Sequence, residues 1–205
     1  MAYFNTEWFN GLCAELPRPY LMTIALKIWL TKHFEEVSNR TTTYGDEGAG
    51  QVIWTPNPET GIVIEPITKW LPRLTEARPA ILIKRGDWKR IKLGIGDRYH
   101  TPNELGKQYF ENWWQGTHIL LCISGEAAEA ENISAEVSRL LNTFGWYFLK
   151  IMNLKKFEVV QIGELKLLQE GRDNFFVPVV IEYIFGDSWT VQPLNEPELS
   201  EVQDN

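Results

Sequence analysis

Continuous and alternating runs of apolar residues predict a series of strands through the middle and end of this chain. Residues 118–123 (HILLCI) are apolar at every position after the histidine, a pattern typical of a strand covered on both faces, so we expect a central strand there. Residues 89–95 alternate apolar with basic positions, which predicts a half-exposed strand. The other predicted strands are residues 51–54, 61–65, 80–84, 107–114, 157–168 and 175–185.

Glycine-containing pairs predict two turns between these strands. Gly86-Asp87 is expected to form a tight hairpin after the strand at 80–84, because glycine supplies the backbone freedom that two-residue turns need. Gln115-Gly116 is expected to turn the chain into the central strand.

The last two strands are predicted to form a long hairpin joined by residues 169–174. Pro178 lies inside the second of them, and a proline cannot donate to a strand ladder, so we expect an edge position or a bulge there. An exposed edge of that length needs a cover, which a neighbouring subunit would provide.

Three segments show the apolar spacing of helices. The first runs from Asn5 or Thr6 to Leu16 and the second from about Tyr20 to Val37. The third runs from about 125 to 145, where Gly145 is placed to end it; residues 146–154 either extend it or cross to the next strand. The predicted stripe of the second helix is Leu21, Ile24, Ala25, Ile28 and Trp29, with Leu26 and Leu30 elsewhere, which indicates packing on more than one side.

The order of these elements predicts one α+β domain. We expect residues 1–187 to form a mainly antiparallel sheet with helices packed on one face and an extended hairpin. Residues 188–205 carry acids, two prolines and few apolar residues, which predicts a flexible acidic tail.

The charge is distributed unevenly along the chain. The net charge is −7, yet residues 69–98 hold nine Lys or Arg against three acids, so this segment carries +6 and the remainder −13. Such a basic segment is either a solvated hairpin or a contact for nucleic acid or an acidic partner, as in an adaptor protein.

The residues that usually carry metal or catalytic chemistry do not form a recognisable set. Cys13 and Cys122 give no metal-binding pair, and Cys122 is interpreted as a small buried apolar residue of the central strand. His33, His100 and His118 share no ligand spacing, and His118 is interpreted as a satisfied strand residue. We therefore expect no metal, no cofactor and no enzyme activity, and, without a signal or bilayer-length segment, a soluble protein.

One short motif leaves an enzymatic alternative open. Glu164-Leu165-Lys166 matches the Glu-x-Lys that metal-dependent nucleases place on one strand, where side chains two residues apart share a face. The alternative function is thus a nucleic-acid-processing enzyme that uses Glu164 and Lys166. A salt-bridged solvent face of a hairpin explains the same residues.

The succession of segments resembles the neck proteins of tailed bacteriophages. The resemblance covers residues 78–190 and is carried by RPAILI at 78–83, GDW at 86–88, IGDR at 95–98, GTHI at 116–119 and the closing strand FFVPVVIEY at 175–183. It points to the tail-terminator (tail-completion) or head–tail connector group.

The resemblance implies a structural virion protein without catalysis. Its copies would form a closed ring, commonly of six, that terminates the tail tube and joins it to the head. Its partners would be further copies, neighbouring neck proteins and the tail tube protein, with DNA passing through the lumen without sequence-specific binding and no membrane. It would assemble in the host cytoplasm and reside in the virion. The candidate inter-ring or lumen contacts are Lys84, Arg85, Lys89, Arg90, Lys92, Arg98, Tyr99 and His100.

Overall fold

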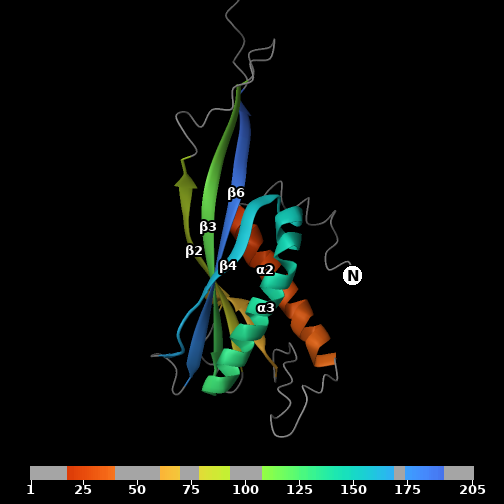
Figure 1. The fold of residues 1–205 in the computed structure, drawn as a ribbon, viewed down its shortest axis with the longest axis vertical. Coiled ribbons are helices and arrows are strands. Elements are labelled where there is room, and N and C mark those ends of the chain that lie inside the picture. The colour runs from red at the N-terminus through yellow and green to blue at the C-terminus, as the bar shows by residue number, and fades with distance from the viewer. Residues whose placement is uncertain (1–17, 40–60, 70–78, 93–107, 169–173, 192–205) are drawn as a thin grey trace, which may run out of the picture.

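The computed structural model describes residues 18–39, 61–69, 79–92, 108–168 and 174–191, and these form one layer of helices on a mixed sheet (Figure 1). The sheet has six strands in the order β1-β2-β3-β6-β4, with the short β5 also paired to β6. Only β1 and β2 run parallel; every other pair is antiparallel. The elements are α2 Arg18–Asn39, β1 Val63–Pro66, the 3₁₀ turn η1 Ile67–Lys69, β2 Ala80–Ile91, β3 Gln108–Ser124, α3 Ala127–Ile151, β4 Leu154–Ile162, β5 Lys166–Leu167 and β6 Phe175–Val191.

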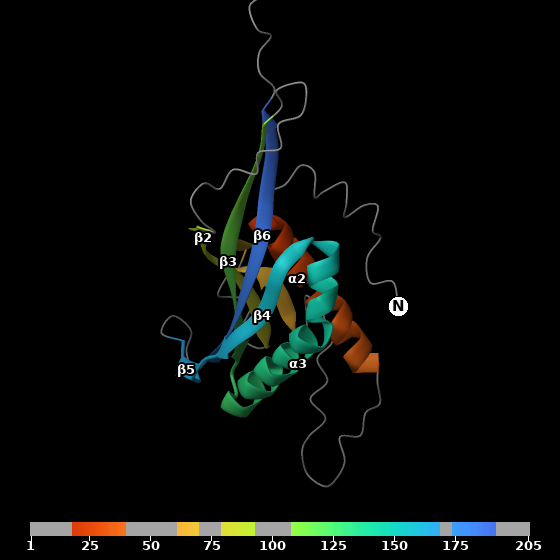
Figure 2. The same ribbon diagram turned by 45° about the horizontal axis from the view of Figure 1, so that its top comes forward.

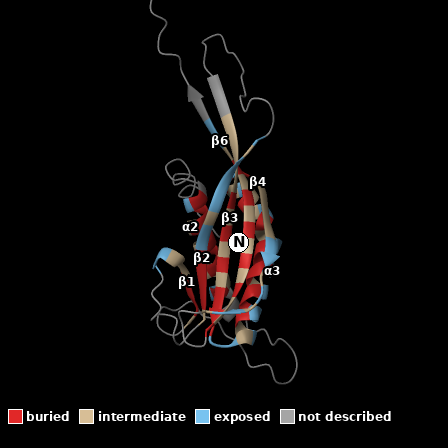
Figure 3. Ribbon diagram, turned by 90° about the vertical axis from the view of Figure 1, so that its left-hand side faces the viewer, coloured by how far each residue is buried: buried red, intermediate tan, exposed pale blue. Residues whose placement is uncertain are grey.

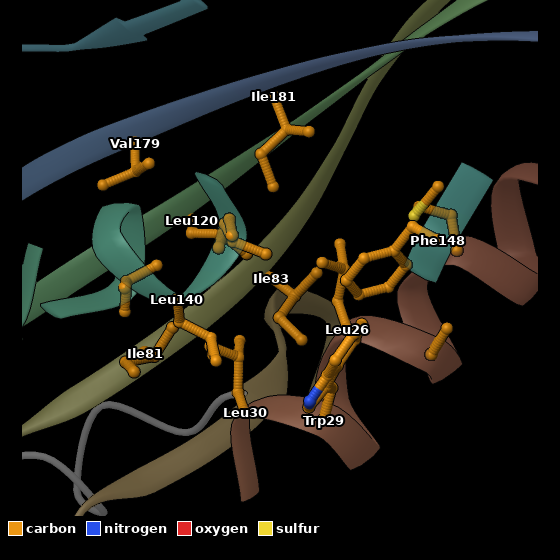
Figure 4. Packing of buried hydrophobic residues seen from close by; sticks show 14 of the residues in the cluster. Leu26, Trp29, Leu30, Ile81, Ile83, Leu120, Leu140, Phe148, Val179 and Ile181 are labelled. Carbon is orange, nitrogen blue, oxygen red and sulfur yellow. The ribbon is translucent and has the colours of Figure 1, made fainter. Parts of the chain in front are cut away.

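The predicted α+β class, with helices on one face of a mostly antiparallel sheet, is confirmed. Side chains from alternate positions of the strands meet both helices in one core, as Figure 4 shows for Ile81, Ile83 and Leu120 beside Leu26 and Leu30. The predicted central strand is also central in space, since β3 lies between β2 and β6. Cys122 is fully buried there, as expected of a small apolar residue.

The two helices meet through aromatic side chains. Trp29 of α2 packs against three rings of α3, with ring centroids 5.7 Å from Phe144, 4.9 Å from Tyr147 and 4.3 Å from Phe148. The buried stripe of α2 differs from the prediction, because Leu26 and Leu30 are both fully buried. They face the sheet while Trp29 faces α3, which is the packing on two sides that the sequence indicated. The stripe comprises Leu21, Met22, Ala25, Leu26, Trp29, Leu30 and Phe34.

Both predicted glycine turns within the sheet are wrong. Residues 108–124 form one strand, β3, without a turn at Gly116. Residues 80–91 also form one strand, β2, in which Gly86 and Asp87 make a β-bulge between Arg85 and Trp88 and no hairpin. In each case glycine allows a close approach within the sheet, because a Cβ on Gly86 would lie 3.1 Å from the carbonyl oxygen of Thr117.

The predicted helix end at Gly145 is also wrong, since α3 continues to Ile151. Gly145 is buried, and a Cβ there would lie 3.2 Å from the ring of Phe157. The glycine therefore lets α3 lie close to β4. The helix ends at Ile151, and Asn153, just after the C-cap residue Met152, has a φ of 48°, the left-handed conformation that asparagine tolerates better than most residues.

The last two strands pair antiparallel as predicted, but Pro178 is not at an edge. β6 lies between β3 and β4, and the edge is β4 with β5. The Gly163 amide donates to the Pro178 carbonyl oxygen at 2.7 Å, so this carbonyl group faces the break between β4 and β5. In a strand the nitrogen and the carbonyl group of one residue point to the same side, so the nitrogen of Pro178 faces the break as well. Because no ladder amide is needed at that break, the proline is accommodated inside the sheet.

β1 lies at the other end of the sheet. It pairs in parallel with β2 from Val63↔Ala80 to Pro66↔Ile83. Residues 51–54, like the predicted helix from Asn5 or Thr6 to Leu16, lie outside the described residues.

The outer ends of β3 and β6 project beyond the helices as a two-stranded ribbon (Figures 1 and 2). The β3–β6 register runs from Ser124↔Phe175 to Gln108↔Val191 without a break. In the described residues, β2 leaves β3 at Trp113 and β4 leaves β6 at Phe185, so only the two strands remain beyond these points. β6 also continues to Val191, past residue 188 where the tail was predicted to start.

Candidate functional site

Five of the eight candidate contact residues lie on the outer half of β2 or directly after it. Lys84, Arg85, Lys89, Arg90 and Lys92 are all exposed, and Figure 3 shows β2 changing from buried to exposed along its length. β1 pairs only with Ala80–Ile83, so within the described chain no strand lies on the outer side of Lys84–Ile91. We call residues 84–92 the basic edge.

The register distributes these charges to both faces of the sheet. Arg85 pairs with His118 and Arg90 with Trp114, which places both arginines on the face that carries the helices. Lys84 pairs with Ile119 and Lys89 with Gln115, on the opposite face. With five basic residues against Asp87 alone, the basic edge carries a net charge of +4.

An aromatic group adjoins the basic edge on the helix-bearing face. Trp88 is 43% exposed, and its ring centroid lies 5.5 Å from that of Trp114 and 6.3 Å from that of Phe185. Arg90 donates to the Asn112 side-chain oxygen at 2.7 Å, which orients its guanidinium along the base of the ribbon. This arrangement of planar rings and cations can contact a protein or a polyanion.

Three of the predicted contact residues, Arg98, Tyr99 and His100, lie outside the described residues. The structure therefore brings together the five basic residues of β2 and its end.

The opposite border of the sheet exposes three large apolar side chains, which the sequence did not lead us to predict. Val160, Ile162 and Leu167 are 41%, 49% and 58% exposed, and all three belong to β4 or β5. In the part of the chain that the structure describes, no strand pairs with β4 on its outer side. We call residues 160–167 the apolar edge. The sequence gives no separate signal for it, because only the strand order shows that these residues lie at a border.

A buried polar cluster lies between α2 and the sheet. His118 and Tyr183 are both fully buried, and the His118 Nε2 lies 2.9 Å from the Thr23 hydroxyl oxygen. The Thr23 hydroxyl can donate to the Pro19 carbonyl oxygen at 3.2 Å, in which case a neutral His118 donates from Nε2 to Thr23. The prediction of a satisfied strand histidine is thus half right, because His118 Nδ1 and the Tyr183 hydroxyl have no hydrogen-bond partner among the described residues.

The environment of His118 disfavours its charged form. Burial is the main cause, the nearby Arg85 guanidinium adds to it, and together they lower the pKa of His118 from 6.5 to about 4. Burial likewise raises the pKa of the Tyr183 hydroxyl. This cluster is a neutral polar element of the core and not a site open to solvent.

The Glu-x-Lys pair of the alternative function does not share one strand. Glu164 lies in the break between β4 and β5, and Lys166 begins the two-residue β5; both are exposed. Glu158, the acid that could accompany them, forms an ion pair with Lys156 on β4. Within the described residues, no group of three or more His, Cys, Asp or Glu is placed to hold a metal ion.

No helix in the described part of the chain combines the length and apolarity needed to cross a membrane. Comparison with known proteins adds no assignment: no protein-family model matches this chain, and no curated protein matches its sequence.

Proposed function

We propose that this protein is a structural subunit that assembles with copies of itself into a ring in the neck of a tailed bacteriophage. In this role the ring terminates the tail tube and joins it to the head, and the subunit carries out no catalysis. The observation that carries the proposal is the apolar edge, where β4 and β5 have no described strand on their outer side and present three exposed large apolar side chains.

An edge of this kind favours association between chains. Unpaired backbone groups accept a strand from a neighbour, and natural monomers usually protect such edges with charges or proline. Val160 and Ile162 do the opposite, since burying them in a contact is favourable. A contact between the apolar edge and a different surface of the next copy is heterologous, and such contacts close into rings when the rotation permits.

The basic edge and the ribbon suit contacts outside a single ring. Both extend past the helices, where a neighbouring layer or the lumen would be reached. A positive border on a chain of net charge −7 also favours an acidic neighbour.

The first test replaces apolar side chains of the apolar edge by lysine. In the variant Val160→Lys/Ile162→Lys we expect the ring-sized species to be lost, because lysine on an edge strand opposes strand addition. Both positions are more than two-fifths exposed, so the free energy of unfolding should change by only about 0.5 kcal/mol. Size-exclusion chromatography with light scattering and negative-stain microscopy measure the assembly, and urea denaturation measures the stability.

The matched control is Tyr20→Lys/Trp146→Lys. These side chains are 52% and 60% exposed but lie on α2 and α3, away from the apolar edge, and the control should assemble like the parent. A parent chain that stays monomeric at every concentration, or a lysine edge variant that assembles normally, would contradict the proposal.

A second test reverses charge on the basic edge. We expect Lys89→Glu/Arg90→Glu/Lys92→Glu to reduce the assembled fraction without unfolding the subunit, because these exposed side chains contribute to contacts and not to the core. The melting temperature by circular dichroism should stay close to that of the parent.

The control for this reversal is Arg139→Glu/Lys150→Glu/Lys155→Glu, which changes the net charge equally at exposed positions on α3 and β4. If both triple variants assemble as the parent does, the basic edge has no part in assembly.

A further inference from the structure

The basic edge is a strand border with a ready acidic complement in the same chain. Residues 84–92 carry +4, and no described strand pairs with the outer side of β2 there. The residues after β6, 192–205, contain four acids (Glu196, Glu198, Glu201 and Asp204) and no Lys or Arg. Opposite charges of equal size therefore lie on two segments of one subunit.

Proline positions divide this C-terminal segment into two parts. Pro193 and Pro197 fall within the first six residues, and residues 198–204 (ELSEVQD) contain none. A strand added to an edge must supply backbone N–H groups, which proline lacks. Residues 198–204 thus have both the charge and the backbone chemistry needed to pair with β2.

The geometry of the ribbon allows this segment to reach the basic edge of its own subunit. β6 ends at Val191, which pairs with Gln108, whereas β2 ends at Ile91, which pairs with Trp113, five residues further along β3. Five residues of strand span about 17 Å, and three strand spacings from β6 to a new strand outside β2 span about 14 Å. The straight-line distance from Val191 to the position of a new strand beside Ile91 is then about 22 Å. Seven residues of extended chain, from Val191 to Glu198, span at most about 23–25 Å, which covers this distance.

The direction of the strands is also suitable. β2 and β6 are both antiparallel to β3, so both run toward the tip of the ribbon. A segment that leaves β6 at the tip and turns back would run antiparallel to β2. Its seven residues span about 23 Å, which nearly matches the eight residues from Lys84 to Ile91.

From these observations we propose that residues 198–204 add to the outer edge of β2 in the same subunit as an antiparallel strand, held by the basic side chains of residues 84–92. This inference concerns the single subunit and does not depend on ring formation.

The first experiment measures amide hydrogen exchange in the full-length chain. The comparison variant, Glu198→Gln/Glu201→Gln/Asp204→Asn, keeps the length of the chain and removes the charge attraction. We expect amides of residues 84–91 to exchange about tenfold faster in the variant than in the parent, which corresponds to about 1.4 kcal/mol of lost protection. Peptides covering residues 119–123 of β3, which lie inside the sheet, serve as the internal control and should not change.

The second experiment uses a carbodiimide, which joins a carboxylate directly to a lysine amine without a spacer. Cross-links from Glu198, Glu201 or Asp204 should reach Lys84, Lys89 or Lys92 and not the exposed Lys150 or Lys166, which lie on α3 and β5. An equal mixture of ¹⁴N- and ¹⁵N-labelled chains should give these cross-links within one isotope only.

Three outcomes would overturn the inference. They are unchanged exchange over residues 84–91 in the variant, cross-links spread equally over all exposed lysines, and cross-links that join the two isotopes. None of them bears on assembly through the apolar edge, which is measured separately by light scattering, so the failure of one proposal can be told from the failure of the other.

Discussion

Replacing Gly116 by alanine should destabilise the protein by about 2–3 kcal/mol, the range found for overpacked cores. An added Cβ would lie 2.5 Å from Cζ of Tyr183 and 2.7 Å from both Cε2 and the hydroxyl oxygen. The Tyr183 ring cannot move aside easily, because it is fully buried and its centroid lies 5.5 Å from His118 and 6.1 Å from Phe185. Urea denaturation followed by tryptophan fluorescence gives the change in unfolding free energy.

The chain supplies a matched control and a rescue for this substitution. At Gly125, in the turn between β3 and α3, an added Cβ meets only the Asn174 side-chain oxygen, at 3.9 Å, so Gly125→Ala should be nearly neutral. In a Tyr183→Leu background the ring is gone, and Gly116→Ala should cost much less than in the parent. Equal losses at Gly116 and Gly125 would show that the ring does not impose glycine on β3.

Lowering the pH from 7.5 to 5 should reduce the stability of the folded chain by about 2 kcal/mol through His118 alone. The pKa of His118 falls from 6.5 to about 4 on folding, because burial and the nearby Arg85 disfavour the imidazolium. The unfolded state therefore binds the proton at a higher pH than the folded state. Stability is fully present above pH 6.5 and is lost as the pH falls toward 4, by about 3 kcal/mol in total.

The measurement is the unfolding free energy across this pH range for the parent and for His118→Gln. Glutamine retains a polar group toward Thr23 but does not titrate, so the variant should lose the His118 part of the slope while carboxylates contribute equally to both proteins. A variant with the same pH slope as the parent would mean that His118 is protonated equally in the folded and unfolded states.

The class of fold could be predicted because it depends on patterns that are local in the sequence. The apolar run at 118–123 marked a central strand, and the spacing of apolar residues marked α2 and α3. These signals state which face of an element is buried. They do not state what lies against it, and this is where the predictions failed.

The three glycines show the limit most clearly. Gly86, Gly116 and Gly145 were each predicted to turn or end an element, and each lies inside one. Each is required by a neighbour far away in the sequence: Thr117 lies over Gly86, Tyr183 over Gly116 and Phe157 beside Gly145. A glycine in a sequence has the same appearance whether it supplies a turn or space for a ring.

The candidate site was predictable in part. The cluster of Lys and Arg in residues 69–98 pointed to the basic edge, because charge is visible in sequence without knowledge of the fold. The apolar edge was not predictable, since Val160, Ile162 and Leu167 are apolar residues of a strand pattern and only the strand order shows that they lie at a border. Because of Pro178 we expected β6 to lie at this border, whereas β6 lies between β3 and β4.

The continuity of β3 and β6 has a mechanical consequence. Each is a single strand of 17 residues that is anchored at one end beneath α2 and α3 and free of them at the other. No hinge interrupts either backbone, so the direction in which the ribbon points is fixed by the helix-covered body. A load applied at the tip is carried by two unbroken backbones to the body of the sheet, where His118 of β3 contacts Thr23 of α2.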